Sequence, residues 1–314
     1  MLKLVQNEWM KLWSKRSTWI MVLLLVLIIS AGIGIMKWTH KTQNIGIEED
    51  WEQIVMNELQ FNESQLLNPE LSEVQLAYYE GLVEIGRYRL AEDVPPFEPD
   101  SMQQQILNSY TMLSLVTLFT VIAAAGIVAA EFSQGTIKML LTRPVSRWKI
   151  LTSKYLAVLL FGLLLIVITV AASAAAGFFF LGIGEGQFLA WNGSEVVEAS
   201  FWSESLRMVG LSSVSVLMIT TFAFMIGTVF RSSSLAIGLS IFLLFAGTQV
   251  VFLLADFEIV KYYLFTHIDL TQFYTGFMPV PDITLALSVT VLIAYFLVFL
   301  IISYWTFSRR DTTA

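Results

Sequence analysis

Polar side chains inside one long apolar run are the residues of this chain best suited to binding a polar ligand. The run begins at Ile106, and its first half carries hydroxyl and amide groups at close spacing: Asn108, Ser109, Thr111, Ser114, Thr117 and Thr120. Polar side chains at membrane depth usually face protein or water. The pattern therefore predicts either hydrogen bonds between helices or the lining of a path through a membrane.

Side chains for covalent or metal chemistry are scarce. The sequence has no cysteine, and its two histidines, His40 and His267, stand alone outside the apolar runs, where an ordinary surface histidine is far more common than a metal ligand. It contains no H-E-x-x-H, G-x-S-x-G or G-x-x-x-x-G-K-[ST] motif. We expect no catalytic residue, no metal site, no nucleic-acid partner and no nucleotide site in the chain itself.

The composition indicates an all-α integral membrane protein. Hydrophobic residues make up 56% of the 314 residues and charged residues 14%, whereas charged residues average roughly 25% in soluble domains. A bilayer core needs about 20 mainly apolar residues. Six runs meet this length and are expected to form transmembrane helices: 19–36, 106–130, 155–184, 208–230, 235–255 and 283–307. None contains Asp, Glu, Lys, Arg or His as drawn, which disfavours a carrier coupled to protons or ions and leaves only one that coordinates sodium through backbone and hydroxyl oxygens.

The charges predict the orientation of these helices. Although the net charge is −7, basic residues gather in alternate connecting segments and acidic residues in the others. The positive-inside rule places both termini in the cytoplasm, as six spans require. We therefore expect a multi-pass protein of the plasma membrane. The basic residues on the cytoplasmic side would be Lys3, Lys11, Lys15, Arg16, Lys138, Arg143, Arg147, Lys149, Lys154, Arg231, Arg309 and Arg310.

Three segments outside the spans carry helical patterns. Residues 1–18 place apolar side chains, two tryptophans among them, at helical spacing with lysines beside them, which predicts a helix in the plane of the membrane interface; an ordinary charged lead-in to the first span is the alternative. Residues 37–105 would form an acidic extracytoplasmic insertion. Two of its segments have apolar residues at helical spacing, which predicts a helical hairpin, and Asn68-Pro69 is expected to turn between them and start the second helix. Residues 256–282 are aromatic and polar, so they would lie on or dip into the outer leaflet.

The cytoplasmic segment 131–154 interrupts two of the longest apolar runs. Ile137, Leu140 and Leu141 stand at positions i, i+3 and i+4, which predicts a short helix with one apolar face. Such a helix exposed to the cytosol needs a partner.

Three motifs resemble those of the membrane subunits of type-2 ABC exporters, of the bacitracin- and sodium-efflux permease kind. They are Asn7–Arg16 (NEWMKLWSKR), Glu131–Lys154 (EFSQGTIKMLLTRPVSRWKILTSK) and Lys261–Gln272 (KYYLFTHIDLTQ). The second is the most specific, and the resemblance covers nearly the whole chain except the acidic insertion. It implies that the segment after Glu131 is a coupling helix, which docks into a separate cytoplasmic ATPase.

The residues of the segment suit that role. Gly135 permits a sharp change of direction and Pro144 stops the short helix, while Thr136 can cap it. Arg147 fits either a partner contact or a simple topology anchor. The coupling residues implied by the resemblance are therefore Glu131, Gly135, Thr136, Ile137, Leu140, Leu141, Pro144 and Arg147. The family lines its substrate path with the second and fifth spans, which here implies Asn108, Thr111, Ser114, Thr248 and Gln249.

The expected function is thus that of a permease subunit without catalytic activity of its own. It would export an amphipathic peptide, lipid or drug-like substrate by alternating access, paired with a second permease copy or a sister permease. Two copies of the cytoplasmic ATP-binding subunit would hold ATP and Mg. A membrane-anchored sensor or assembly scaffold that uses the acidic hairpin remains the alternative, and an intramembrane enzyme is disfavoured by the missing catalytic groups.

Overall fold

The computed structural model describes residues 1–43, 51–69, 71–136, 139, 145–230, 232–255, 257–280 and 283–309. Over these residues the protein is a multi-pass, all-α membrane protein with six helices long and apolar enough to cross a bilayer. The candidate spans are α2 (Arg16–Gln43), the run of α5 (Met102–Leu107), η1 (Asn108–Met112) and α6 (Leu113–Ser133), then α8 (Arg147–Phe180), α9 (Phe201–Val229), α10 (Ser233–Leu253) and α13 (Leu285–Arg309).

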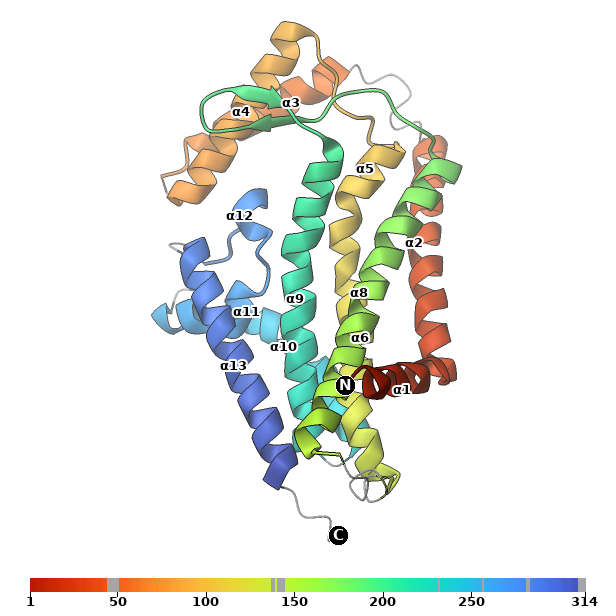
Figure 1. The fold of residues 1–314 in the computed structure, drawn as a ribbon. Coiled ribbons are helices and arrows are strands. Elements are labelled where there is room, and N and C mark those ends of the chain that lie inside the picture. Colours follow the sequence, from red (N-terminus) through yellow and green to blue (C-terminus); the bar gives the residue numbers. More distant parts are fainter. Residues whose placement is uncertain are drawn as a thin grey trace.

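The core of the bundle lies where α6 packs against α8, α9 and α10 (Figure 1). A Cβ atom at Gly227 of α9 would lie 2.4 Å from the Ala125 carbonyl oxygen of α6, so only glycine permits this approach of the two backbones. At Gly162 of α8, an added Cβ would lie 3.2 Å from the Thr120 side-chain methyl group of α6, which is a tight but less severe contact. Small residues at helix contacts are the usual means of close packing in membranes, and here they place α6 at the centre.

The second predicted span, 106–130, is not one regular helix. It consists of α5, the 3-10 segment η1 and α6, and it extends to Ser133. Ser109, Thr111 and Ser114 each donate a side-chain hydrogen bond to the carbonyl three residues before. Hydroxyl groups of this kind compete with the helical backbone pattern, and short 3-10 segments often mark such places.

Helix α1 (Leu2–Trp13) lies across the lower end of the bundle in Figure 1. It is shorter than the predicted 1–18, because the chain turns at Ser14 and α2 begins at Arg16. Its buried residues are Glu8 and Leu12. The rings of Trp9, Trp13 and Trp19 pack edge to face at the turn, which fixes α1 at an angle to α2.

The acidic insertion forms an antiparallel helical pair, α3 (Trp51–Leu66) and α4 (Glu73–Glu92), at the opposite end of the bundle from α1 (Figure 1). α4 does not start at Pro69 as predicted but after Ser72, where Ser72 and Gln75 form a capping box. The buried Arg89 donates hydrogen bonds to the carbonyls of Val94 and Gln187. The bond to Gln187 fastens α4 to the loop after α8.

The same loop carries a short antiparallel hairpin, which the sequence patterns do not predict. Its strands are β1 (Leu189–Trp191) and β2 (Val196–Glu198). The Trp191 ring packs at Gly81 of α4, where an added Cβ would lie 3.0 Å from it. The hairpin therefore covers part of α4.

The aromatic segment folds back between α10 and α13 as η2 (Glu258–Tyr262), α11 (Leu264–His267) and α12 (Gln272–Thr275) (Figure 1). His267 is fully buried, so the expectation of a surface histidine is wrong for it. Its ring bonds to the Ser288 hydroxyl and the Lys261 carbonyl. Gln75 of α4 reaches the same segment by donating a hydrogen bond to the Gly276 carbonyl.

Candidate functional site

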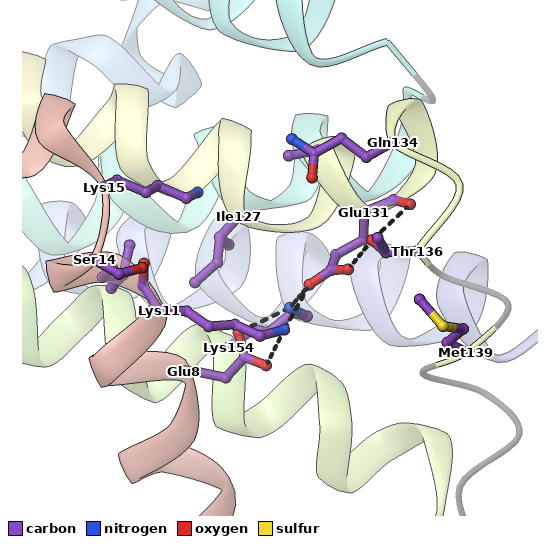
Figure 2. Close-up of a pocket in the computed structure, with 12 residues that line it drawn as sticks. Glu8, Lys11, Ser14, Lys15, Ile127, Glu131, Gln134, Thr136, Met139 and Lys154 are labelled. Carbon is purple, nitrogen blue, oxygen red and sulfur yellow. Dashed lines mark hydrogen bonds and ion pairs between the residues drawn. The ribbon is translucent and has the colours of Figure 1, made fainter.

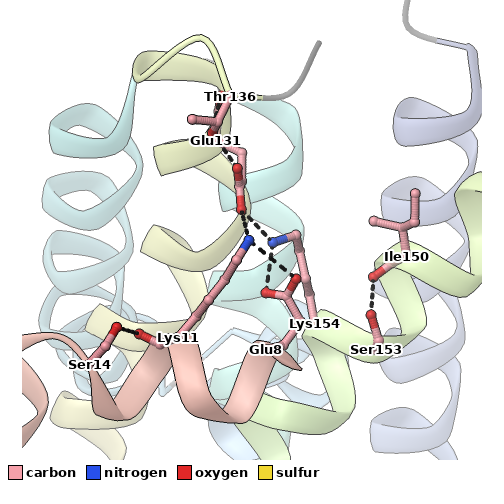
Figure 3. A network of polar contacts seen from close by, with 8 residues as sticks. All are labelled: Glu8, Lys11, Ser14, Glu131, Thr136, Ile150, Ser153 and Lys154. Atoms are coloured by element: carbon pink, nitrogen blue, oxygen red, sulfur yellow. Dashed lines mark hydrogen bonds and ion pairs between the residues drawn. The ribbon is translucent and has the colours of Figure 1, made fainter. Parts of the chain in front are cut away.

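A buried ion cluster joins three elements at the end of the bundle that carries α1 (Figure 3). The Lys154 ammonium of α8 lies 2.9 Å from a carboxylate oxygen of Glu8 on α1 and 2.9 Å from one of Glu131 on α6. Lys11 approaches the same Glu131 oxygen at 3.1 Å and Glu8 at 3.7 Å. The cluster therefore ties α1, α6 and α8 together through charged side chains.

Local structure explains why these side chains meet. Glu8 and Leu12 are one helical turn apart, so both lie on the face of α1 that packs against the bundle. Glu131 stands in the last turn of α6, where the chain leaves the apolar core. Lys154 lies about two turns into α8, and its long aliphatic stem suits a buried path to a polar site.

Burial makes this cluster energetically important. The Lys154 side chain is 1% exposed and the Glu8 side chain 6% exposed. A charge in such a place is tolerated only when it is paired and hydrogen-bonded. The side chain of Lys11 is 46% exposed, so its contribution is screened by water. The strongest interactions of the cluster are therefore the two ion pairs that Lys154 forms with Glu8 and Glu131.

The chain that follows α6 is attached to the same cluster. Gly135 has a φ of +70°, a left-handed conformation that favours glycine. The next residue, Thr136, donates a short hydrogen bond to the Glu131 carboxylate (Figure 3). The hydroxyl that was expected to cap a short helix is thus engaged with Glu131. The start of the connection between α6 and α8 is held by the buried charges.

A partly enclosed cavity of about 330 Å³ lies beside the cluster (Figure 2). α1 contributes Lys11, and the turn after it contributes Ser14 and Lys15. Glu131 of α6 and Gln134, which follows that helix, line it from the other side. Burial and the neighbouring Lys154 charge lower the pKa of Lys15 from its usual value. Within the described residues, no group of three or more His, Cys, Asp or Glu side chains could hold a metal ion. The cavity offers charged groups and hydrogen-bond donors that can bind a polar ligand. The ion cluster beside it can transmit movement between α1, α6 and α8.

The predicted coupling residues separate into three groups. The structure brings Glu131, Gly135 and Thr136 together at the cluster. Arg147 lies apart from them at the start of α8, where it donates a hydrogen bond to the Ser308 carbonyl near the end of α13. The remaining four, Ile137, Leu140, Leu141 and Pro144, lie outside the residues that the structure describes.

The predicted path residues lie on exposed surfaces. Asn108, Thr111 and Ser114 are exposed along α5, η1 and α6, while Thr248 and Gln249 are exposed near the end of α10. Their neighbour Thr120 is buried and accepts a hydrogen bond from Thr220 of α9 at 2.9 Å. Of the two roles predicted for the polar side chains of this span, hydrogen bonding between helices is the one that Thr120 has.

Sequence reasoning missed the importance of Glu8 and Lys154, and it drew the spans without Asp, Glu, Lys, Arg or His. The helices are longer than the predicted spans, since α6 continues through Glu131 and α8 already includes Lys154. One available signal was isolation: Glu8 is the sole acidic residue before Glu48, and Glu131 is the sole one between Ile106 and Gly184. A lone acid among basic residues indicates a specific partner.

Comparison with known proteins gives a family and two relatives. Residues 88–313 match the model of the family described as protein of unknown function (DUF2705). The chain is 37% identical over 320 residues to the uncharacterized protein YhcI of Bacillus subtilis (strain 168), which covers 99% of both chains. It is 28% identical over 201 residues to the uncharacterized membrane protein YdbK of the same organism, covering 63% of this chain and 78% of YdbK.

Proposed function

Because the chain belongs to the DUF2705 family, whose description leaves the function open, we propose from its site that it is the membrane subunit of an ABC exporter. It moves an amphipathic peptide, lipid or drug-like substrate outward, and a separate ATP-binding subunit supplies the energy. In this proposal it lies in the plasma membrane with both termini in the cytoplasm, on the side where the basic residues gather.

The observation that carries this proposal is the attachment of Glu131 and Thr136 to the buried ion cluster. A partner that moves the segment after α6 acts directly on Glu131. Lys154 passes this displacement to α8, and Glu8 passes it to α1. Buried pairs of this kind resist separation, so the three elements move together.

The energy comes from outside the chain. Two copies of the ATP-binding subunit bind ATP and Mg, and their closure moves the segment after α6 in each of two permease copies, or in this chain and a sister permease. The cavity between the permeases then alternates between inward-open and outward-open states. Asn108, Thr111, Ser114, Thr248 and Gln249 line it, which gives their exposed polar side chains a function within a membrane.

Copurification tests the partner. The full-length chain is isolated in mild detergent from its native host, and associated ATP-binding subunits and ATPase activity are measured. The double variant Leu140→Asp/Leu141→Asp is expected to lose both and still insert in the membrane. The matched control Gln53→Asp/Gln60→Asp adds the same charge at exposed positions of α3 and is expected to retain them. A double Leu variant that keeps its ATPase refutes the docking assignment.

One observation favours a second candidate, the sensor or assembly scaffold. The α3–α4 pair exposes large apolar side chains among its acidic residues, namely Met56, Phe61 and Leu67. Exposed apolar groups on a solvated element can form a binding surface. If the wild-type chain copurifies with no ATP-binding subunit but crosslinks through α3 to another protein, the scaffold function replaces the exporter.

A further inference from the structure

The cavity beside the ion cluster is lined by one ammonium group, that of Lys15, which is not part of the cluster. Lys15 lines the cavity, and within the described part of the chain it forms no ion pair. In Figure 2 the dashed lines join Lys11, Glu8, Lys154 and Glu131, and none reaches Lys15. Burial and the positive charge of Lys154 make its ammonium less favourable, which lowers its pKa. An anion bound beside Lys15 would stabilise its charged form.

Among the described residues, the charges that line the cavity add up to an excess of one positive charge. Three lysines, Lys11, Lys15 and Lys154, line it together with two carboxylates, Glu8 and Glu131. Both carboxylates are already neutralised by Lys154 and Lys11 at 2.9 to 3.1 Å. The Lys15 ammonium is therefore the cation left for an incoming anion.

The cavity also has the size and the donors for a small anionic group. Its volume of about 330 Å³ is at the lower end of small-molecule sites, which span roughly 300–1,000 Å³. The Gln134 amide stands exposed at its wall and can donate a hydrogen bond. A headgroup fits such a space, whereas the acyl chains of a lipid need an apolar surface outside it.

The surroundings of the cavity are those of a membrane interface. Lys15 lies in the turn between α1 and the first span, next to Trp13 and close to the exposed Trp19. Tryptophan side chains concentrate at headgroup depth, and basic residues on an interfacial helix attract anionic lipids. We propose that this cavity binds the phosphate group of an anionic phospholipid, with Lys15 as its ionic contact and the acyl chains outside beside α2.

Lipid dependence of the full-length chain tests the proposal. The protein in neutral detergent is titrated with phosphatidylglycerol, and its melting temperature and bound lipid are measured, the latter by native mass spectrometry. Phosphatidylcholine and free glycerol phosphate are the two comparison ligands. The variants are Lys15→Ala, Lys15→Arg and the control Lys3→Ala, which removes an exposed lysine of α1 that does not line the cavity.

Phosphatidylglycerol is expected to stabilise the wild type and Lys3→Ala at the same concentration. Lys15→Ala should need roughly ten to a hundred times more of it, the ratio that corresponds to one lost charge-assisted hydrogen bond. Lys15→Arg should keep most of the effect. Because Lys15 pairs with no carboxylate in the described residues, its removal should leave the unliganded protein folded.

Four results overturn the proposal. An unchanged lipid response in Lys15→Ala removes the site. Equal stabilisation by phosphatidylcholine shows that the anionic headgroup does not matter, and equal stabilisation by free glycerol phosphate shows a soluble anion in place of a lipid. If Lys15→Ala loses a copurifying protein and keeps its lipid response, the cavity is a protein contact. Lipid binding here does not depend on an ATPase partner, so failure of one proposal leaves the other standing.

Discussion

Replacing Lys154 by methionine removes the central charge of the ion cluster and keeps an unbranched side chain of similar length. The carboxylates of Glu8 and Glu131 then lose the cation that stands 2.9 Å from each of them. Lys11 stays within 3.1 Å of one and 3.7 Å of the other. The stability of this variant therefore measures how much the ion pairs of the buried Lys154 contribute beyond those of Lys11.

The structure sets the size of the effect. Breaking a buried ion pair by removing one partner costs about 3–5 kcal/mol. An exposed pair contributes roughly 0–1 kcal/mol, so Lys11, at 46% exposed, can compensate for only a small part. We expect Lys154→Met to lower the free energy of unfolding by about 2–5 kcal/mol. The comparison variant Lys11→Ala should lower it by less than about 1 kcal/mol.

The free energy is measured by titrating the protein in mixed micelles with a denaturing detergent. Tryptophan fluorescence suits the purpose because the chain has 9 tryptophans, several of them around α1. The double variant Lys154→Met/Glu8→Gln should recover part of the loss, since it removes one of the unpaired charges. If Lys154→Met is no less stable than Lys11→Ala, or if the second substitution recovers nothing, the cluster does not hold the three helices.

Three further predictions concern single positions. Gly227→Ala should destabilise by about 1–3 kcal/mol through overpacking against α6, whereas Gly210→Ala, which has open space on the same helix, should not; unfolding titrations compare them. Gly135→Ala should cost about 1 kcal/mol because its φ is +70°, while Gly238→Ala inside α10 should be neutral or slightly stabilising in the same assay. Burial lowers the pKa of His267 despite its bond to the Lys261 carbonyl. Its contribution to stability should therefore be present above about pH 6.5 and decline below it, because the unfolded chain then binds the proton more readily. Melting temperatures between pH 8 and pH 5 should show this decline in the wild type and a flatter profile in His267→Gln.

Run length and composition were sufficient to predict the six spans, since each depends on local apolar content. The boundaries differ where a charge has a partner far along the chain. The predicted spans end at Ala130 and begin at Tyr155 because Glu131 and Lys154 are charged. The helices continue through both residues, which neutralise each other.

The site was partly predictable for the same reason. Glu131, Gly135 and Thr136 are neighbours in sequence, so their association follows from a local pattern. Glu8 and Lys154 are 146 residues apart, and no periodicity links them. The burial of His267 likewise depends on Ser288, which is 21 residues away on α13, so a reading of the residues around the histidine gave the wrong environment.

The contact between α4 and the aromatic segment has a consequence for biosynthesis. Gln75 bonds to a carbonyl 201 residues later, and the Tyr78 ring packs on the same glycine, Gly276. At about 5–20 residues per second, a ribosome needs roughly 10–40 seconds to cover that distance. During synthesis, one side of α4 therefore stays uncovered until the residues around Gly276 have been made. A truncated product that stops before residue 257 would keep that side open to proteases.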